Sequence, residues 1–411
     1  MRKSILILAM IALVAVFAIS CKNEPATPDQ YEVTINYNGS SKKISVIDDS
    51  SIADNWNEIK KAISVEEEVD DFIFEIEGSE VTASTKIKSA TVIKIVDLIK
   101  ISTLEEFENY IKVGGRAILN SDITYGKKGE KNEQGKTISR SFSKDMKLDL
   151  NNNTLTLNSS VSLKGENIIE IFNGKVLSDI GYGLVSAAIQ LFSKSKLILT
   201  DVDFSSETTG LFAVNNENDT LIKLERTNLI AKGNYGIGTN ATPTESQNVK
   251  FIIKDSVVST KGAADGDNSA ILFNVKGGVD IENSTIIGDR HAVILRGGIE
   301  HSIVDSKLEV TGGNSVSTEY LNGNWSSGNE VPLAAIVIGN RSGAYLYPTV
   351  AKLDGITISA PEKNTVGKEY YGLYVYQNDA TNTVNVAGTI KDFEKIRINK
   401  DSMNNATFDV K

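Results

Sequence analysis

A short phrase recurs seven times between Lys147 and Glu309, and this repeat limits the folds that the chain can adopt. Each copy has an apolar–x–apolar strand, a turn residue that is mostly Asn or Asp, a small neighbour and a second apolar strand. The residues two before and three after this turn residue, the anchor, are apolar in every copy, although only 40% of the chain is apolar. The anchors are Asn152, Asn173, Asp201, Arg226, Asp255, Asn283 and Asp305.

The spacing of the anchors varies, from the interval between Asn152 and Asn173 to the longer one between Arg226 and Asp255. Such variation suits coils whose strands stay in register while loops absorb insertions. One copy cannot bury its apolar side alone, so the copies are expected to stack, with parallel strands about 4.8 Å apart. Connections between parallel strands are overwhelmingly right-handed. A third strand per coil is visible at 210–214, 270–275, 292–297, 333–340 and 371–378. The predicted fold is all-β, a right-handed parallel β-helix over residues 100–411.

The chain resembles the pectin-lyase-like right-handed β-helix superfamily. The resemblance rests on TLEEFENYIKVGGRAILNSDI (Thr103–Ile123) and KLDLNNNTLTL (Lys147–Leu157), and it extends to near the C-terminus. It implies the fold strongly and an activity only weakly, because that superfamily holds polysaccharide lyases, hydrolases, adhesins and inert stalks. Function has to be argued from a site.

The N-terminus indicates secretion and a membrane anchor. Arg2 and Lys3 precede an uncharged apolar run over residues 5–19, which is typical of a signal peptide (1–20). The run ends in Ala-Ile-Ser-Cys21, similar to the lipobox of bacterial lipoproteins. The resemblance implies cleavage before Cys21 and lipidation of its thiol. The alternative is a leftover secretory cysteine. Because Cys21 is the only cysteine, we expect no disulfide in the mature chain. We expect a membrane-anchored protein of a diderm bacterium, at the outer membrane or cell surface, facing the periplasm or the exterior.

Two regions precede the repeat. Residues 21–30, with Pro25 and Pro28, are typical of a tether. Residues 31–99 have the pattern of a hairpin, a helix at 53–63 and further strands, which predicts a small α/β module that resembles a β-grasp in its order of elements. A capping helix is then expected at 104–112, beginning at Ser102 or Thr103, with Glu105 and Glu106 placed for capping. Such a helix covers the first coil's open end, which is otherwise an edge for aggregation.

The net charge argues against binding to polyanions. The formal charge is −10, and it becomes more negative when Arg2 and Lys3 leave with the signal peptide. We therefore expect no nucleic-acid partner.

Catalytic motifs of β-helix enzymes are scarce. Polygalacturonase-like hydrolases need paired Asp residues, Gly-His-Gly and Arg-x-Lys; the 397–400 segment only superficially resembles the last, and His291 and His301 lack flanking glycines. Pectate-lyase-like enzymes use acidic calcium ligands and an arginine base. The nearest match is Asp201, Arg226 and Asp255, which should lie one above another. A surface charge ladder in which the arginine relieves repulsion is favoured over a catalytic arginine.

Three further features favour structural roles. The Asp265–Asn268 loop offers oxygens to calcium, but an Asx/Gly turn is the stronger interpretation, because calcium needs six to eight oxygens. His301 occupies an inward position, which predicts a buried, neutral, hydrogen-bonded side chain. The Asn residues among the anchors predict a stacked amide ladder. No metal ion or other cofactor is expected.

One region departs from the short, regular copies of the repeat. Residues 311–332 form a long insertion, and the strands beside it are apolar on both faces, so something should cover the outer face. The insertion is either a structural lid or part of an aromatic platform for sugar rings or a partner protein. The candidate platform residues are Tyr320, Trp325, Tyr345, Tyr347, Tyr374 and Tyr376.

The leading functional hypothesis is non-catalytic recognition of a glycan or a surface partner. A polysaccharide lyase or glycoside hydrolase and a purely structural surface protein are the alternatives. A charged, grooved cluster of Arg or Lys with carboxylates favours an enzyme, whereas an exposed aromatic patch favours a binder.

Overall fold

The computed structural model describes residues 29–131, 133, 138–180, 187–192, 194–214, 219–239, 248–261, 269–312, 332–340, 347–363, 367, 369–377, 382–402 and 407–411. It divides the chain into two compact units, Met1–Leu98 and Ile99–Lys411. Cys21, the loop at 265–268, Tyr320, Trp325 and Tyr345 lie outside the described residues.

The first unit packs one helix against a small mixed sheet. Strands β1 and β2 form a hairpin through Asn38 and Gly39, both of which have positive φ. β1 also pairs in parallel with β7, and β4 pairs antiparallel with β5 and β7. Trp56 and Ile59 of the helix are buried against Phe72 and Phe74 of β4. The elements are β1 (Gln30–Tyr37), β2 (Ser40–Ile47), β3 (Ser50–Ser51), α2 (Trp56–Ile63), β4 (Phe72–Ile76), β5 (Ser79–Val81), β6 (Lys86–Ile87) and β7 (Val92–Ile101).

The second unit begins with α3 (Leu104–Val113), close to the predicted helix. The Thr103 hydroxyl accepts the Glu106 N–H (3.2 Å), and the Glu106 carboxylate accepts the Thr103 N–H (3.0 Å). The backbone N–H groups of Ser102 and Thr103, which donate to the Glu106 carboxylate, lower the pKa of Glu106. Phe107 is buried and meets the rings of Tyr125 and Phe142, so the helix covers the first strands of the unit.

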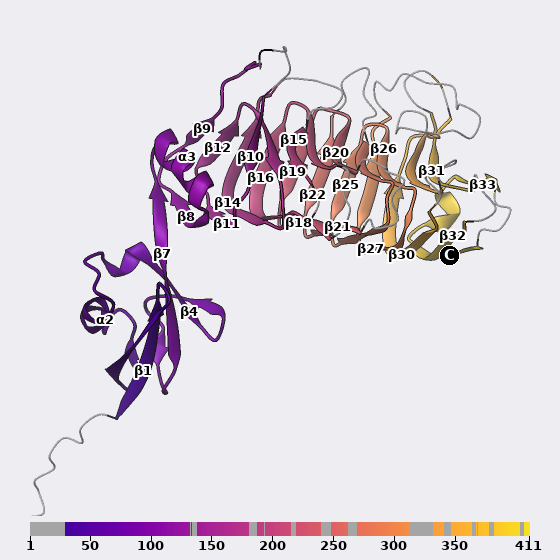
Figure 1. The fold of residues 1–411 in the computed structure, drawn as a ribbon. Helices are drawn as coiled ribbons and strands as arrows, with labels where there is room; N and C mark the ends of the chain where they lie inside the picture. The colour runs from indigo at the N-terminus through magenta and orange to yellow at the C-terminus, as the bar shows by residue number, and fades with distance from the viewer. Residues whose placement is uncertain are drawn as a thin grey trace, which may run out of the picture. The chain divides into compact units, whose positions relative to one another are not determined.

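Parallel strands stack side by side along the second unit, as Figure 1 shows, and their pairings follow three rows. The first row is β8 (Gly115–Leu119), β11 (Met146–Asp149), β14 (Ile168–Ser178), β16 (Lys196–Ser206), β18 (Thr220–Glu225), β21 (Val249–Lys254), β24 (Gly277–Glu282), β27 (Gly298–Val304), β30 (Thr349–Ser359), β32 (Val384–Ile390) and β34 (Thr407–Val410). The second is β9 (Ile123–Tyr125), β12 (Thr154–Leu157), β14, β16, β19 (Asn228–Ala231), β22 (Val257–Thr260), β25 (Thr285–Gly288), β28 (Lys307–Val310) and β30.

The third row contains the additional strand of each repeat. Its members are β10 (Ser139–Phe142), β13 (Ser160–Leu163), β15 (Ala187–Leu191), β17 (Thr209–Ala213), β20 (Tyr235–Thr239), β23 (Ser269–Phe273), β26 (His291–Leu295), β29 (Ala334–Ile338), β31 (Tyr371–Tyr376) and β33 (Ile398–Ser402). Neighbours in all three rows pair in parallel. The prediction of an all-β, solenoid-like stack of parallel strands is confirmed.

The apolar columns line the interior, as the repeat predicted. Every residue two before and three after an anchor is at most 2% exposed. Leu224, Ile253, Ile281 and Ile303 are consecutive partners across neighbouring strands, so equivalent side chains pack on one another. Full burial of such a side chain contributes roughly 1.5–3 kcal/mol. The interior stack is therefore the main source of stability.

The anchors share an unusual backbone conformation. All seven have φ between 45° and 63°, in the left-handed region. Asn and Asp tolerate this region better than other residues with side chains, which explains the composition of the column. Gly355, with φ of 65°, occupies the same corner one strand beyond Asp305, and a Cβ there would lie 2.7 Å from an Asp305 carboxylate oxygen. The corner therefore extends the repeat by one copy that the sequence pattern missed.

Among the residues that the structure describes, no helix is both long and apolar enough to span a membrane.

Candidate ligand-binding sites

A ladder of hydroxyl groups follows the corner. Thr227, Ser256, Ser284 and Ser306 each stand one position after an anchor, and all are at most 4% exposed. The backbone N–H of each of the first three donates to the hydroxyl oxygen of the next, over 3.0, 3.1 and 3.0 Å. Each hydroxyl in turn donates to a carbonyl two residues earlier. The small residue after each anchor thus supplies hydrogen-bond partners for the buried backbone groups at the turn.

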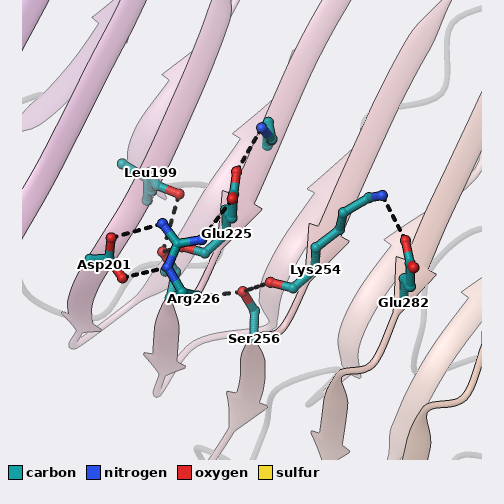
Figure 2. A network of polar contacts seen from close by, with 9 residues as sticks. Leu199, Asp201, Glu225, Arg226, Lys254, Ser256 and Glu282 are labelled. Atoms are coloured by element: carbon teal, nitrogen blue, oxygen red, sulfur yellow. Dashed lines mark hydrogen bonds and ion pairs between the residues drawn. The ribbon is translucent and has the colours of Figure 1, made fainter. Parts of the chain in front are cut away.

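Outside this corner lies a network of charged side chains (Figure 2). The Arg226 guanidinium donates from Nε and Nη2 to the two carboxylate oxygens of Asp201, over 2.8 and 2.9 Å, and from Nη1 to Glu225 over 2.7 Å. Lys254 pairs separately with Glu282 at 2.6 Å. Asp255 accepts a hydrogen bond from the Asn283 amide.

The predicted stacking of Asp201, Arg226 and Asp255 at one corner is present, because all three line one shallow groove of about 390 Å³. Their predicted pairing is only partly right. Arg226 points toward Asp201 and Glu225, whereas Asp255 has the Asn283 amide as its partner. The expected amide ladder is likewise partial: Asn283 and Asn173 each donate to a carboxylate on the neighbouring strand, the latter over 3.3 Å to Asp149.

At this corner the pKa shifts of Asp201, Glu225 and Arg226 all favour their charged forms. Hydrogen bonding from Arg226 lowers the pKa of Asp201, and Lys223 and then Arg226 lower the pKa of Glu225. The same carboxylates raise the pKa of Arg226. An arginine that acts as a base needs its pKa lowered, so the shift runs against a catalytic role for Arg226.

The outer face of the third row is apolar and covered, as expected. Leu272, Ile294, Val337 and Tyr374 are consecutive partners along it. The first three are at most 3% exposed, and they belong to a second apolar cluster with Tyr376.

The structure places three of the six platform residues. Tyr347 is 5% exposed, with the Lys276 ammonium 5.7 Å from its ring centroid. Tyr376 is fully buried, and its ring lies where any side chain at Gly339 would be, 2.2 Å from a Cβ there. In this arrangement neither ring offers a face to a ligand. Tyr374 is half-buried and keeps part of its ring accessible.

Tyr374 belongs to a row of three side chains, two of them on β31 and the third, Arg397, just before β33, which we name the Tyr374 row. Its ring meets that of Tyr371 edge-on at 5.3 Å, and the Arg397 guanidinium lies over the Tyr371 ring at 4.5 Å. Strict alternation puts Tyr371 on the inner face with Leu373. Tyr371 instead packs against the outer apolar cluster together with Tyr374, and an added Cβ at Gly372, the residue between Tyr371 and Leu373, would lie 2.3 Å from the Ile396 side chain.

Arg397 also borders a cleft of about 540 Å³ near the C-terminus, which we name the Arg397 cleft. Its backbone is held by the Gly372 N–H, which donates to the Arg397 carbonyl over 2.8 Å. Its side chain pairs with Glu369 at 2.5 Å, and this hydrogen bond raises the pKa of Arg397. The charged lining residues are Glu362, Lys363, Glu369, Lys395 and Arg397.

His301 has the structural role that its position predicted. It is 3% exposed; Nδ1 accepts the Val279 N–H (3.2 Å), so Nε2 carries the proton and donates to the Gly297 carbonyl (2.7 Å). Burial lowers its pKa to about 4. Within the described part of the chain, no group of three or more His, Cys, Asp or Glu side chains is arranged to hold a metal ion.

Comparison with known proteins gives no family. Neither a family model nor a curated protein matches the chain.

Proposed function

We propose that the second unit is a right-handed parallel β-helix with three strands per coil, of the pectin-lyase-like kind. The three rows of parallel strands support this, because successive strands such as β18, β19 and β20 enter the three rows in turn and β21, β22 and β23 repeat the order. The left-handed anchor at every repeat gives each coil the same corner.

We also propose that the protein is a lipoprotein anchored through Cys21, at the outer membrane or cell surface of a diderm bacterium. The proposal rests on the signal-peptide pattern of residues 1–20 and on Cys21 being the only cysteine.

For the second unit we propose non-catalytic recognition of a glycan or a surface partner, with a glycan favoured. The observation that carries this proposal is the row of Tyr374, Tyr371 and Arg397 beside the Arg397 cleft. Half-buried tyrosines combine an apolar ring with a polar tip, and the cleft adds polar groups that can bond hydroxyls.

The charged corner supports binding over cleavage. Arg226 is held protonated by Asp201 and Glu225, so it serves as a cross-link between neighbouring strands rather than as a proton acceptor.

The test is a glycan array probed with the soluble chain that lacks residues 1–21. We expect binding to a defined set of glycans, with no shortening of the bound chains on prolonged incubation. Absence of binding to every glycan would refute glycan recognition, and shortening of a bound polysaccharide would establish the enzyme alternative.

A further inference from the structure

The sheet of the first unit has one long open edge, the strand β2. Within the described part of the chain, β2 pairs with β1 alone, in a regular antiparallel register from Gln30 and Ile47 to Tyr37 and Ser40. The opposite edge is β5, which has three residues against the eight of β2. β2 contains neither a proline nor a bulge, which are two devices that keep an edge strand from pairing with another chain.

The backbone of β2 offers hydrogen-bonding groups along this edge. The two-residue turn between β1 and β2 makes Tyr37 and Ser40 a hydrogen-bonded pair, so every second residue from Ser40 onward bonds to β1. The Ile47 carbonyl accepts the Ser50 hydroxyl at 2.5 Å and keeps a second lone pair. The residues whose N–H and C=O groups point away from β1 are Ser41, Lys43, Ser45 and Ile47.

The beginning of the open edge is basic. Lys42 and Lys43 are both exposed. Lys43 pairs across the hairpin with Glu32 at 2.6 Å, on the face of the sheet away from α2. Lys42 is the charged residue that lines the groove between β2 and the end of α2, and it has no ion-pair partner among the residues that the structure describes. One positive charge at this end is therefore not compensated.

The other end of the edge is acidic. Asp48 and Asp49 follow the last residue of β2, and the Asp29 carbonyl beside them accepts the Asp48 N–H over 2.8 Å. Lys88 lies 3.8 Å from Asp49. The negative charge of Asp48, followed by burial and by the charge of Asp29, raises the pKa of Tyr31. This shift indicates an excess of negative charge at this end.

We propose that β2 pairs with β2 of a second copy of this chain, antiparallel about a two-fold axis at Ser45. In this register Lys42 of each copy lies opposite Asp48 of the other, and Ile44 lies opposite Val46. Both pairs occur twice, because a two-fold contact uses the same patch on both copies. The inference concerns the first unit and is independent of the proposed glycan recognition.

The charges select the direction of pairing. A parallel arrangement in register sets Lys42 against Lys42, and like charges directly opposite are destabilising. The antiparallel arrangement sets lysine against aspartate, so the lysines that discourage other strands favour this one. The outward backbone groups also meet, Ser45 with Ser45 and Lys43 with Ile47. The stem of Lys43 then covers Ile47, which is 47% exposed in the single chain.

Sedimentation velocity of the soluble chain that lacks residues 1–21, at rising concentration, measures the association. A contact along one strand is small, so we expect a weak monomer–dimer equilibrium. Lys42→Asp sets aspartate against aspartate in both pairs, and Asp48→Lys sets lysine against lysine. Each variant alone should raise the Kd at least tenfold. An equimolar mixture of the two variants has opposite charges in every pair and should dimerise about as well as the parent chain.

Lys391→Asp is the matched control, because it makes the same change of net charge at an exposed residue of the second unit and should leave dimerisation unchanged. Ser45→Pro removes the N–H at the axis and spares the bonds to β1, so it should weaken the dimer with little change in melting temperature. A chain that stays monomeric up to about 1 mM overturns the inference. Association that neither charge variant weakens, or a mixture that fails to associate, overturns it as well.

Discussion

The Arg226 guanidinium bonds both carboxylate oxygens of Asp201 while its own backbone has a φ of 47°, a conformation that arginine seldom adopts. The equivalent positions in the other six copies hold Asn or Asp. The ion pair with Asp201 therefore requires arginine at this position, whereas the left-handed backbone conformation favours Asn or Asp.

Two substitutions of Arg226 distinguish the effect of the ion pair from that of the backbone conformation. Arg226→Asn and Arg226→Val both remove the ion pair with Asp201, but only Asn suits the left-handed corner. In that region a side chain on Cβ costs roughly 1–2 kcal/mol, and a β-branched residue is the worst case. We expect Arg226→Asn to melt close to the parent chain and Arg226→Val to melt clearly lower, as measured by circular dichroism. Equal melting temperatures for the two variants would show that the corner does not require this conformation.

A charge at an interior position should be far more damaging than one on the outer face. Ile281 is 1% exposed and packs in the stack, whereas Thr285, four residues later, is half-buried on the outside of β25. Ile281→Asp leaves an unpaired charge inside and should cost several kcal/mol of unfolding free energy. Thr285→Asp should be mild. Chemical denaturation of both variants is the measurement, and comparable losses would mean that the inward register is wrong.

His301 should make stability depend on pH in a defined window. Its pKa is about 4 in the folded chain, below the ordinary value of 6.5 that applies when the chain is unfolded. The folded state thus binds fewer protons, so its stability is complete above pH 6.5 and is lost as the pH falls toward 4. The unfolding free energy lost across this pH window is about 3 kcal/mol. His301→Gln, which keeps a donor and an acceptor, should flatten the difference in unfolding free energy between pH 7 and pH 4. An unchanged pH profile in the variant contradicts this account.

Membrane attachment should depend on Cys21 alone. Cys21→Ser removes the only thiol, so the protein should move from the detergent phase to the aqueous phase in a phase-separation assay. Unchanged partitioning into detergent would refute lipidation at this residue.

Periodicity predicted the stack of parallel strands because inward positions must be apolar in every copy, and this requirement is visible at Ile253 or Ile281 without any coordinates. The corner could be predicted less well. The Asn and Asp anchors suggested stacked amides, whereas the property that they share is tolerance of a positive φ. The hydroxyl ladder beside them appears in the sequence only as a column of small residues, so its hydrogen bonds could not be predicted.

The Arg397 cleft was not predictable from the repeat. Its lining comes from segments around Glu362, Glu369 and Arg397 that only the fold brings together. Tyr371 was also missed, because strict alternation with Leu373 would place it on the inner face, whereas its ring meets that of Tyr374. Tyr374 was among the candidate platform residues, and it is the half-buried partner of Val337 on the neighbouring strand.

The central claim is that recognition takes place at the Tyr374 row and not at the charged corner. It is tested most directly by the affinity of the soluble chain for the best glycan of the array, measured by calorimetry for Tyr374→Ala, Tyr371→Ala and Arg226→Ala. We predict that each aromatic variant loses about 1–3 kcal/mol of binding free energy with little change in melting temperature, and that Arg226→Ala binds as the parent does. Loss of binding or of polysaccharide cleavage in Arg226→Ala, with full binding in Tyr374→Ala, would contradict the claim.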